Sequence, residues 1–350
     1  MRIAQIAPLT ESVPPKLYGG TERIVSYLTE ELTRLGHDVT LFASGDSQTS
    51  ATLEPMSACA LRFGTTLRDS IAPHMAMLEQ VYRRAHDFDV LHFHLDYWSF
   101  SLFSRIATPF LTTLHGRLDL PEHVPMYDLF PEVPLVSISF AQRRGMPQAN
   151  YVKTIHHGIP TDLLTPQPVQ PSYLAFLGRI APEKRPDRAI RIARRSGMKL
   201  KIAAKVDRVD QEYFNAEIKP MIDGEQIEMI GEIGDHQKSA FLSGAHALLM
   251  PIDWPEPFGL VMIEAMACGT PVIAFDCGSV PEIVDHGMTG FVVDSEDAAV
   301  AAIPRLRQLS RSAIRGRFER RFSAERMAGD YLSLYRQLAT RARPQLRVVS

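Results

Sequence analysis

A proline-rich loop near position 256 leads into a predicted helix and carries two glutamates that could bind a polar ligand. The segment EPFGLVMIEAMACGTPV places Glu256 before the helix and Glu264 inside the helix, about two turns further on than Glu256. Gly259 lets the backbone approach a ligand, and the N–H groups of Phe258, Gly259 and Leu260 suit an anion such as phosphate. Carboxylates at this spacing could hold hydroxyls of two parts of one elongated ligand. Alternatively, Glu256 caps the helix and Glu264 forms a buried salt bridge.

Two cations follow the first strand predicted in the second half of the chain. Arg179 comes directly after Gly178, and Lys184 follows shortly afterwards. At the carboxyl end of a strand they could neutralise a diphosphate, Arg179 through its guanidinium fork and Lys184 as a point charge. On the residues alone, a pair of solvated basic side chains is the other interpretation.

Glycines also separate the first predicted strand from its helix, in the sequence Tyr18-Gly19-Gly20-Thr21-Glu22. Such a loop lets backbone amides approach a phosphate or a sugar, although an ordinary tight turn explains two glycines equally well. Glu22 lies in the first turn of the helix, where an acid is also an ordinary partner of the helix dipole.

His115 ends a predicted strand and precedes Gly116. We expect its side chain to point into a cleft at the strand's carboxyl end, although a lone histidine more often has a structural role. His94 and Asp96 follow the preceding strand and are candidates for contacts with an acceptor. Together with His92 they could also suggest a zinc cluster, but the sequence offers no further ligand set.

Other metal and nucleotide motifs are weaker. Asp87 and Asp89 form a DxD sequence, but this precedes the strand 90–93 and therefore lies at the wrong strand end for the cleft. The sequence contains no GxGxxG and no Walker A motif, which argues against dehydrogenase and P-loop functions. We therefore expect no metal site and no cofactor.

In combination, these residues resemble a known family. Glu256 and Glu264, with seven residues between them, resemble the glutamate-pair motif of the retaining glycosyltransferases of family 4, which have the GT-B fold. The resemblance covers most of the chain, and the order and spacing of its short motifs make it specific. The other matching segments are the Gly19-Gly20 loop, Leu114-His115-Gly116, His157-Gly158-Ile159, Gly178-Arg179 with Lys184, and residues 287–291.

The resemblance implies a role for each matched residue. Arg179 and Lys184 bind the donor diphosphate and stabilise the nucleoside diphosphate as it leaves, and Glu264 binds the ribose. Glu256 contacts sugar hydroxyls, and His115 lies beside the donor sugar, where it helps to stabilise positive charge. The implied catalytic residues are His115, Glu256, Arg179 and Lys184; the donor-binding residues are Gly19, Gly20, Arg179, Lys184, Ile233, Phe258, Gly259, Leu260 and Glu264; the acceptor-side residues are Tyr18, Glu22, His94 and Asp96.

Two departures from the family pattern leave the identities of donor and acceptor open. His157 stands where an asparagine is usual, and the strand 200–204 continues into Lys205, Val206 and Asp207 where glycines are usual. The donor base could be uracil, guanine or adenine.

The expected function is therefore metal-independent, retaining transfer of a sugar from a UDP-, GDP- or ADP-linked donor to a hydroxyl of a saccharide, lipid-linked or small-molecule acceptor. A sugar phosphorylase or sugar-phosphate synthase on the same fold is one alternative. A non-catalytic protein that binds sugars or nucleotides is another alternative. The presence of all five key residues of the implied site argues against it; these are His115, Arg179, Lys184, Glu256 and Glu264.

Short apolar runs alternate with helical stretches along the chain, which is typical of an α/β protein with parallel sheets. A proline-rich stretch at 160–171 indicates a linker between two halves, and we expect a cleft at the carboxyl ends of both sheets. The expected strands are 3–7, 39–43, 90–93, 110–114 and 135–139 in the first half, and 173–177, 200–204, 227–230, 247–251, 271–275 and 290–293 in the second.

With the resemblance, this pattern predicts a GT-B architecture of two Rossmann-like domains facing a central cleft. We expect an N-terminal acceptor-side domain at 1–160 and a C-terminal nucleotide-sugar-binding domain at 161–319. Residues 320–350 should form a helix that crosses back to the N-terminal domain, followed by a basic tail.

The composition is that of an ordinary globular chain. It has 350 residues, of which 45% are hydrophobic and 22% charged, and a formal net charge of −2. Three cysteines far apart imply neither a disulfide framework nor a zinc site and fit a reducing compartment. No apolar run reaches the ~18 residues of a membrane span, and the N-terminus does not resemble a signal peptide. We expect a cytoplasmic location.

The segment 305–347 is strongly basic. It has twelve arginines against three acids, so its charge is 12 − 3 = +9 and the rest of the chain carries −11. This asymmetry suggests peripheral contact with the anionic inner face of a membrane, and a solvated helix face is the alternative. No nucleic-acid motif accompanies the arginines, so we expect no binding to nucleic acid.

Overall fold

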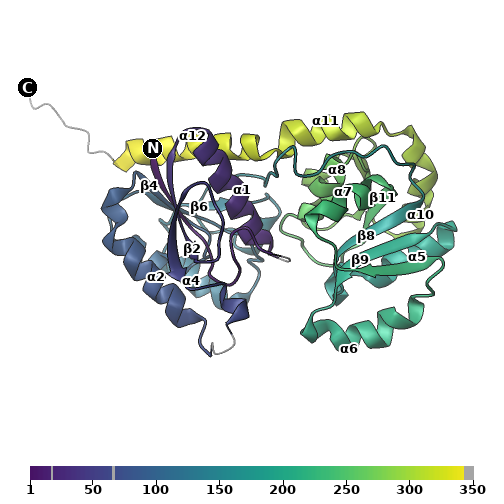
Figure 1. The fold of residues 1–350 in the computed structure, drawn as a ribbon, viewed down its shortest axis with the longest axis horizontal. Coiled ribbons are helices and arrows are strands. Elements are labelled where there is room, and N and C mark those ends of the chain that lie inside the picture. Colours follow the sequence, from purple (N-terminus) through teal and green to yellow (C-terminus); the bar gives the residue numbers. More distant parts are fainter. Residues whose placement is uncertain (17–18, 65–67, 343–350) are drawn as a thin grey trace, which may run out of the picture. The chain divides into compact units, whose positions relative to one another are not determined.

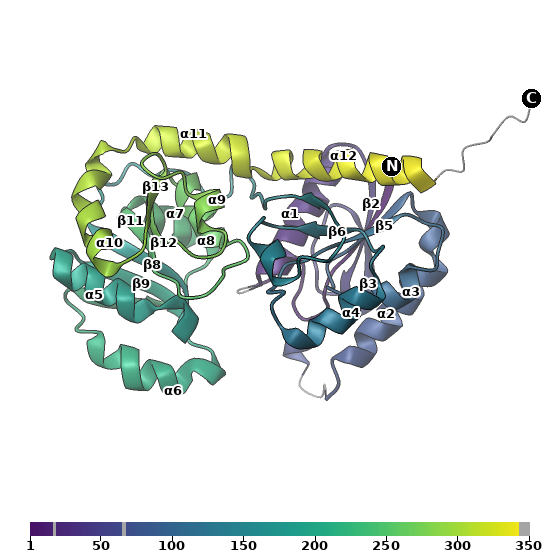
Figure 2. The same ribbon diagram turned by 180° about the vertical axis from the view of Figure 1, so that it is seen from behind.

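The computed structural model describes residues 1–16, 19–64 and 68–342 (Figures 1 and 2). The chain divides into two compact units. The first unit combines Met1–Gly158 with the chain from Ala324 onward, and the second is Ile159–Ser323. Each unit is built on a parallel sheet of its own, as expected for an α/β protein.

The boundaries of the units differ by a few residues from the predicted 160/161 and 319/320. Ile159 pairs with Ser323 through a short β-bridge, and its N–H donates to the carbonyl of Phe322 at 2.9 Å. This bridge holds the two ends of the second unit together, so the unit begins and ends at these two residues.

The first unit has a seven-stranded sheet in the order β3-β2-β1-β4-β5-β6-β7. The strand order reverses between β1 and β4, and ligands of open α/β sheets bind at the carboxyl ends of such a pair. The strands are β1 (Arg2–Ile6), β2 (Asp38–Ser44), β3 (Thr52–Ser57), β4 (Val90–Phe93), β5 (Phe110–Thr113), β6 (Leu135–Ser137) and β7 (Tyr151–Thr154).

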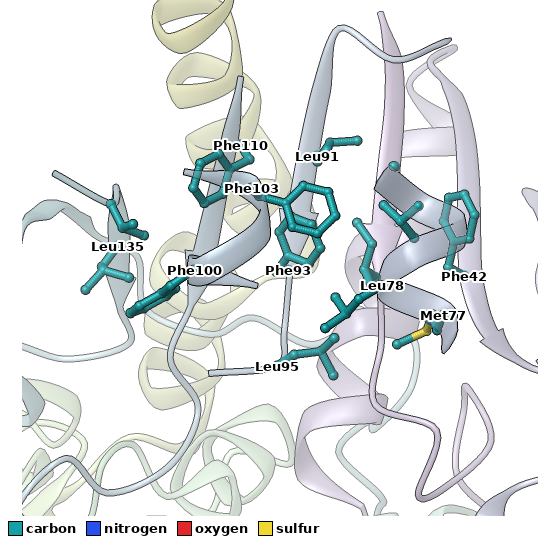
Figure 3. Close-up of a cluster of buried hydrophobic side chains, with 14 of the residues drawn as sticks. Phe42, Met77, Leu78, Leu91, Phe93, Leu95, Phe100, Phe103, Phe110 and Leu135 are labelled. Atoms are coloured by element: carbon teal, nitrogen blue, oxygen red, sulfur yellow. The ribbon is translucent and has the colours of Figure 1, made fainter. Parts of the chain in front are cut away.

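One face of this sheet carries a buried aromatic cluster. The rings of Phe93, Phe103 and Phe110 have centroids 4.5–6.3 Å apart, and Figure 3 shows them beside Phe100 and Leu135. Burial of each such ring contributes about 2–3 kcal/mol. The cluster therefore anchors β4, β5 and the segment between them, and so fixes the strand ends that carry candidate site residues.

Helices cover both faces of the sheet. Helices α2, α3 and α4 contribute to the aromatic face, while α1 and α12 pack against each other on the opposite face. The buried side of α1 follows helical spacing through Ile24, Val25, Leu28 and Leu32. The helices are α1 (Gly20–Arg34), α2 (Ile71–Arg83), α3 (Phe100–Phe103), α4 (Val124–Leu129) and α12 (Ala324–Ala342).

The second unit has a six-stranded sheet in the order β10-β9-β8-β11-β12-β13, which reverses between β8 and β11. Helices α5 and α10 pack together over one face, and α7 and α8 contact strands from the other, with α11 against α8. The strands are β8 (Tyr173–Arg179), β9 (Leu200–Lys205), β10 (Ile227–Gly231), β11 (Ala245–Met250), β12 (Val272–Phe275) and β13 (Gly290–Val293). The helices are α5 (Pro186–Ser196), α6 (Gln211–Tyr213), α7 (Asp235–Ser243), α8 (Leu260–Ala267), α9 (Val280–Ile283), α10 (Glu296–Ala302) and α11 (Arg311–Phe322).

The predicted strands are confirmed, with ends that move by at most two residues. The sequence missed β3 and β7. Both are edge strands of the first sheet and both are only partly buried along their length. Because a partly exposed strand needs no continuous apolar run, its sequence resembles that of a loop.

Candidate functional site

Arg179 ends β8, one of the two strands at the switch point of the second sheet. Its guanidinium lies 2.5 Å from a carboxylate oxygen of Glu183 and 3.5 Å from one of Asp210, with Asp207 at 3.8 Å. Acidic side chains therefore surround this cation. An anionic ligand that binds Arg179 competes with these carboxylates for the guanidinium. The guanidinium is already partly desolvated, so binding exchanges one anionic partner for another.

Lys184 and Glu256 come together although they are 72 residues apart in the sequence. Lys184 lies in the 3-10 turn Pro182–Lys184 after β8, and Glu256 lies in the loop after β11. They form a hydrogen-bonded ion pair beside Trp254, whose Nε1 donates to the same Glu256 oxygen at 2.8 Å. The ammonium group also lies 4.8 Å from the centre of the indole ring. The side chains of Lys184 and Glu256 are only 22% and 11% exposed, so this pair is an oriented, largely desolvated charge site.

The start of α8 lies next to this pair. Gly259 has a left-handed φ of 76°, and a Cβ there would meet the Met250 and Met262 methyl groups at 2.8 Å and Cγ of Glu256 at 3.3 Å. This position therefore requires glycine. Within the described chain no side chain caps α8, and the N–H of Met262 already donates to the carbonyl of Gly259 at 3.0 Å. The backbone N–H groups of Leu260 and Val261 at the start of the helix can therefore bind an anion.

Glu264 is buried inside α8, and its Oε1 accepts a hydrogen bond of 2.7 Å from Lys238. Lys238 also lies 3.1 Å from Asp235. The buried salt bridge that the sequence left open is therefore present. It does not exclude a ligand hydroxyl, because a carboxylate accepts several hydrogen bonds. Ile233 lies between β10 and α7, at the carboxyl edge of the same sheet.

In the first unit, Gly19 precedes α1 and Gly20 is its first residue. A Cβ at Gly19 would lie 2.8 Å from Cβ of Pro15 and 3.1 Å from a carboxylate oxygen of Glu22, so a side chain there would require its neighbours to move. Glu22 is buried in the first turn of α1, and this burial raises its pKa. Tyr18 lies outside the described residues. Glu22 and Pro15 therefore pack closely against Gly19 where α1 begins.

His115 follows β5 and belongs to a group of four histidines, which we call the histidine cluster. Its Nε2 lies 2.8 Å from Nδ1 of His94, and its ring stacks on that of His157 with centroids 5.2 Å apart. The ring of His92 lies 4.1 Å from that of His94. Desolvation lowers the pKa of His115 to about 3 and holds the pKa of each of the other three well below its ordinary value. The four rings are therefore neutral near pH 7.

The structure thus brings His94 to His115, and the described contacts of these two histidines do not include Asp96. His94 is buried and His115 is half-buried, whereas Asp96 is exposed and has an unusual left-handed φ of 47°. Within the described ranges, no group of three or more histidine, cysteine, aspartate or glutamate side chains is arranged to hold a metal ion.

The histidine cluster should make the fold less stable in mild acid. An unfolded histidine has a pKa of about 6.5, so below this pH the unfolded state binds more protons than the folded state. The contribution of His115 is complete above pH 6.5 and is lost as the pH falls toward about 3. We expect the urea midpoint to fall between pH 7.5 and pH 5.5, and the exposed-histidine variant His86→Gln to show the same fall. Equal midpoints at the two pH values would contradict this account.

Arginines of the basic C-terminal segment contact the protein itself. Arg317 and Arg321 both pair with Asp285, at 2.6 and 2.9 Å. These ion pairs compensate part of the positive charge of the segment, so this part of it is not simply a solvated helix face. They give no support to membrane contact. No helix in the described part of the chain is long and apolar enough to span a bilayer. The arginines with oxygen acceptors in their own unit include Arg311, Arg315, Arg317, Arg321 and Arg326.

Three contributors to these sites were not identified from the sequence. Trp254 lies two residues before Glu256 in a loop interrupted by prolines. An aromatic residue this close to the glutamate is the signal that it packs beside the carboxylate and shields it from water. Gln5 contacts the histidine cluster, since its Oε1 lies 2.9 Å from Nε2 of His94. It is an isolated polar residue in an apolar strand, which signals a buried hydrogen-bonding role. Lys238 gave no signal, because only the fold brings it to Glu264.

Two family models match the chain. Residues 18–156 match the model described as Glycosyltransferase Family 4, and residues 165–319 match the model described as Glycosyl transferases group 1. The first match falls in the first unit and the second in the second unit.

Relatives match over the whole length. A phosphatidyl-myo-inositol mannosyltransferase of Mycobacterium leprae is 26% identical, over 97% of this chain and 98% of its own. Sucrose-phosphate synthase from Thermosynechococcus elongatus has a TM-score of 0.80 at 20% identity, over 97% of this chain and 100% of that chain. HepE from Anabaena, in complex with UDP and glucose, has a TM-score of 0.73 at 18% identity, over the same shares. The matched models, the full-length relative and the two parallel sheets show that this chain is a glycosyltransferase of family 4 with the GT-B fold.

Proposed function

We propose that this protein transfers a sugar from a nucleoside diphosphate donor to a hydroxyl of a saccharide, lipid-linked or small-molecule acceptor, with retention of configuration and without a metal ion. The observation that carries the proposal is the Lys184–Glu256 pair beside Trp254, at the switch point of the second sheet and next to the start of α8. A cation, an oriented carboxylate and backbone amides in one place suit a diphosphate joined to a sugar.

In the proposed donor complex, Arg179 and Lys184 contact the diphosphate together with the amides at the start of α8. Arg179 exchanges one or more of its acidic partners for phosphate oxygens. Glu264 binds the ribose, and Glu256 accepts hydrogen bonds from sugar hydroxyls. The two cations and the helix start supply positive charge where other enzymes use a metal ion.

The acceptor hydroxyl attacks the anomeric carbon on the face from which the diphosphate departs. The bond from the anomeric carbon to the phosphate oxygen breaks, a bond to the acceptor oxygen forms, and the departing phosphate takes the acceptor's proton. His115 is neutral and stabilises the positive charge that develops on the sugar. Catalysis depends mainly on positioning and on stabilisation of the leaving group.

The relatives suggest which substrates to test first. HepE was crystallised with UDP and glucose, and the full-length relative is named for mannosyl transfer to phosphatidyl-myo-inositol. Glucose and mannose donors and a lipid acceptor are therefore the first choices for this chain.

A donor panel tests the proposal directly. UDP-, GDP- and ADP-linked glucose and mannose are incubated with the protein in EDTA, and donor hydrolysis and transfer are followed by chromatography and NMR. We expect turnover of one donor, a product with the anomeric configuration of the donor, and no stimulation by Mg²⁺. An inverted product would refute retention, and activity lost in EDTA but restored by Mg²⁺ would refute metal independence. If no donor binds, the proposed substrate class is wrong.

A further inference from the structure

A chain of buried hydrogen bonds links helix α12 to His115. The amide nitrogen of Gln5 donates to the hydroxyl of Tyr335 at 3.1 Å, and Oε1 of Gln5 lies 2.9 Å from Nε2 of His94. The other nitrogen of His94 lies 2.8 Å from Nε2 of His115. Gln5, His94 and Tyr335 are buried, so water does not compete for these bonds.

The Gln5 carbonyl oxygen determines the direction of each bond. A carbonyl oxygen only accepts, so the proton of neutral His94 lies on Nε2 and its Nδ1 is an acceptor. The proton between the two rings must then belong to His115, on Nε2. Neutral His115 consequently has an unprotonated Nδ1.

Tyr335 holds Gln5 in this orientation. Its hydroxyl accepts from the Gln5 amide at 3.1 Å, so the single proton of the hydroxyl is available to Nδ1 of His92, which lies 2.7 Å away. The opposite orientation of the Gln5 amide would reverse the donors along the chain and move the His115 proton to Nδ1. The amide of Gln5 therefore decides which nitrogen of His115 can accept a hydrogen bond.

We propose that Gln5, acting through His94, is a positioning residue that keeps the proton of His115 on Nε2 and leaves Nδ1 as an acceptor for a hydroxyl of the donor sugar. The part of this inference that concerns the sugar rests on the proposed function. The part that concerns the position of the proton rests only on contacts within the first unit.

The position of the proton is measured by NMR on the full-length protein labelled with ¹⁵N-histidine. The two ring nitrogens of a neutral histidine differ strongly in ¹⁵N shift according to which one carries the proton, and the His115 signals are assigned by their absence in His115→Asn. We expect Nε2–H in the wild type and a shift toward the other tautomer in Gln5→Met, which keeps the side-chain size but lacks the amide. Nδ1–H in the wild type, or unchanged His115 shifts in Gln5→Met, would overturn the proposal.

Two tyrosines on α12 provide a matched pair of variants, which also decides the question if Gln5→Met fails to fold. Tyr335→Phe removes the hydroxyl that contacts Gln5 directly. Tyr331→Phe removes a buried hydroxyl that contacts Thr113 at 2.9 Å and reaches Tyr335 only through Thr113 and His92. We expect a changed His115 tautomer in Tyr335→Phe and an unchanged one in Tyr331→Phe. An equal change in both would show that the tautomer does not depend on the hydroxyl in direct contact with Gln5, and would overturn the proposal.

Kinetics then test the part that concerns the sugar. If Nδ1 of His115 accepts a hydrogen bond from a sugar hydroxyl in the transition state, the altered tautomer in Gln5→Met removes that bond. The loss of one ordinary hydrogen bond should lower kcat about tenfold, with little change in donor affinity. An unchanged kcat with an altered tautomer would overturn the role in transfer. If the protein turns over no donor at all, the proposed function fails, while the NMR result still decides the role of Gln5.

Discussion

Replacement of Lys184 by methionine is expected to reduce sugar transfer by about 10²–10³-fold, the usual cost of removing one group that stabilises charge in a transition state. Methionine keeps most of the apolar stem beside Trp254 but removes the ammonium group that pairs with Glu256. In the proposed mechanism this cation also stabilises the departing diphosphate, so kcat should fall more than donor affinity. Steady-state kinetics and isothermal titration with the donor would measure the two effects.

Lys201→Met provides a matched control. Lys201 also pairs with a carboxylate, Glu228 at 3.5 Å, and also lies over an aromatic ring, that of Tyr173 at 4.9 Å. However, it lies near the amino end of β9, away from the carboxyl edge where ligands of such sheets bind. We expect nearly full transfer in this variant. Full activity in Lys184→Met, or an equal loss in both variants, would exclude the proposed role of Lys184.

The sequence predicted those parts of the fold that depend on local pattern. The buried strands β4, β8 and β12 carry apolar runs that can be recognised without any knowledge of their neighbours. The start of α8 was also predictable, because a glycine after a proline-interrupted loop marks the point where a helix begins. By contrast, Pro55 in β3 resembles a loop residue, although an edge strand tolerates proline.

Contacts between distant segments could not be predicted in the same way. Arg179 and Lys184 were expected to be available to a diphosphate, but the sequence does not show that Asp210 and Glu256 already pair with them. Gln5 and Tyr335 are separated by 330 residues, and only the return of α12 to the first unit makes them neighbours. Motif spacing identified candidate residues, whereas their protonation and partners depend on packing.

Replacement of Gly278 by alanine should reduce sugar transfer by more than about 100-fold while the protein remains folded, because a misplacement of about 1 Å can have this effect on a catalytic group. Gly278 has a left-handed φ of 59°, and a Cβ there would lie 2.4 Å from both the backbone N and the backbone O of Glu256. Ser279 N–H also donates to that carbonyl oxygen at 3.0 Å, so the two backbones are held together. The loop that carries Glu256 must therefore move. Transfer kinetics and the melting temperature would be compared with those of the wild type.

Gly197→Ala separates this displacement from simple backbone strain. Gly197 ends α5 with a φ of 67°, close to that of Gly278, but no atom lies within 4 Å of a Cβ built there. Both variants incur the cost of a left-handed alanine, about 1–2 kcal/mol, and should melt at lower temperatures than the wild type. Only Gly278→Ala displaces Glu256, so only this variant should lose transfer. Equal losses of transfer would show that stability limits activity, and full transfer in Gly278→Ala would mean that the position of Glu256 does not control the reaction.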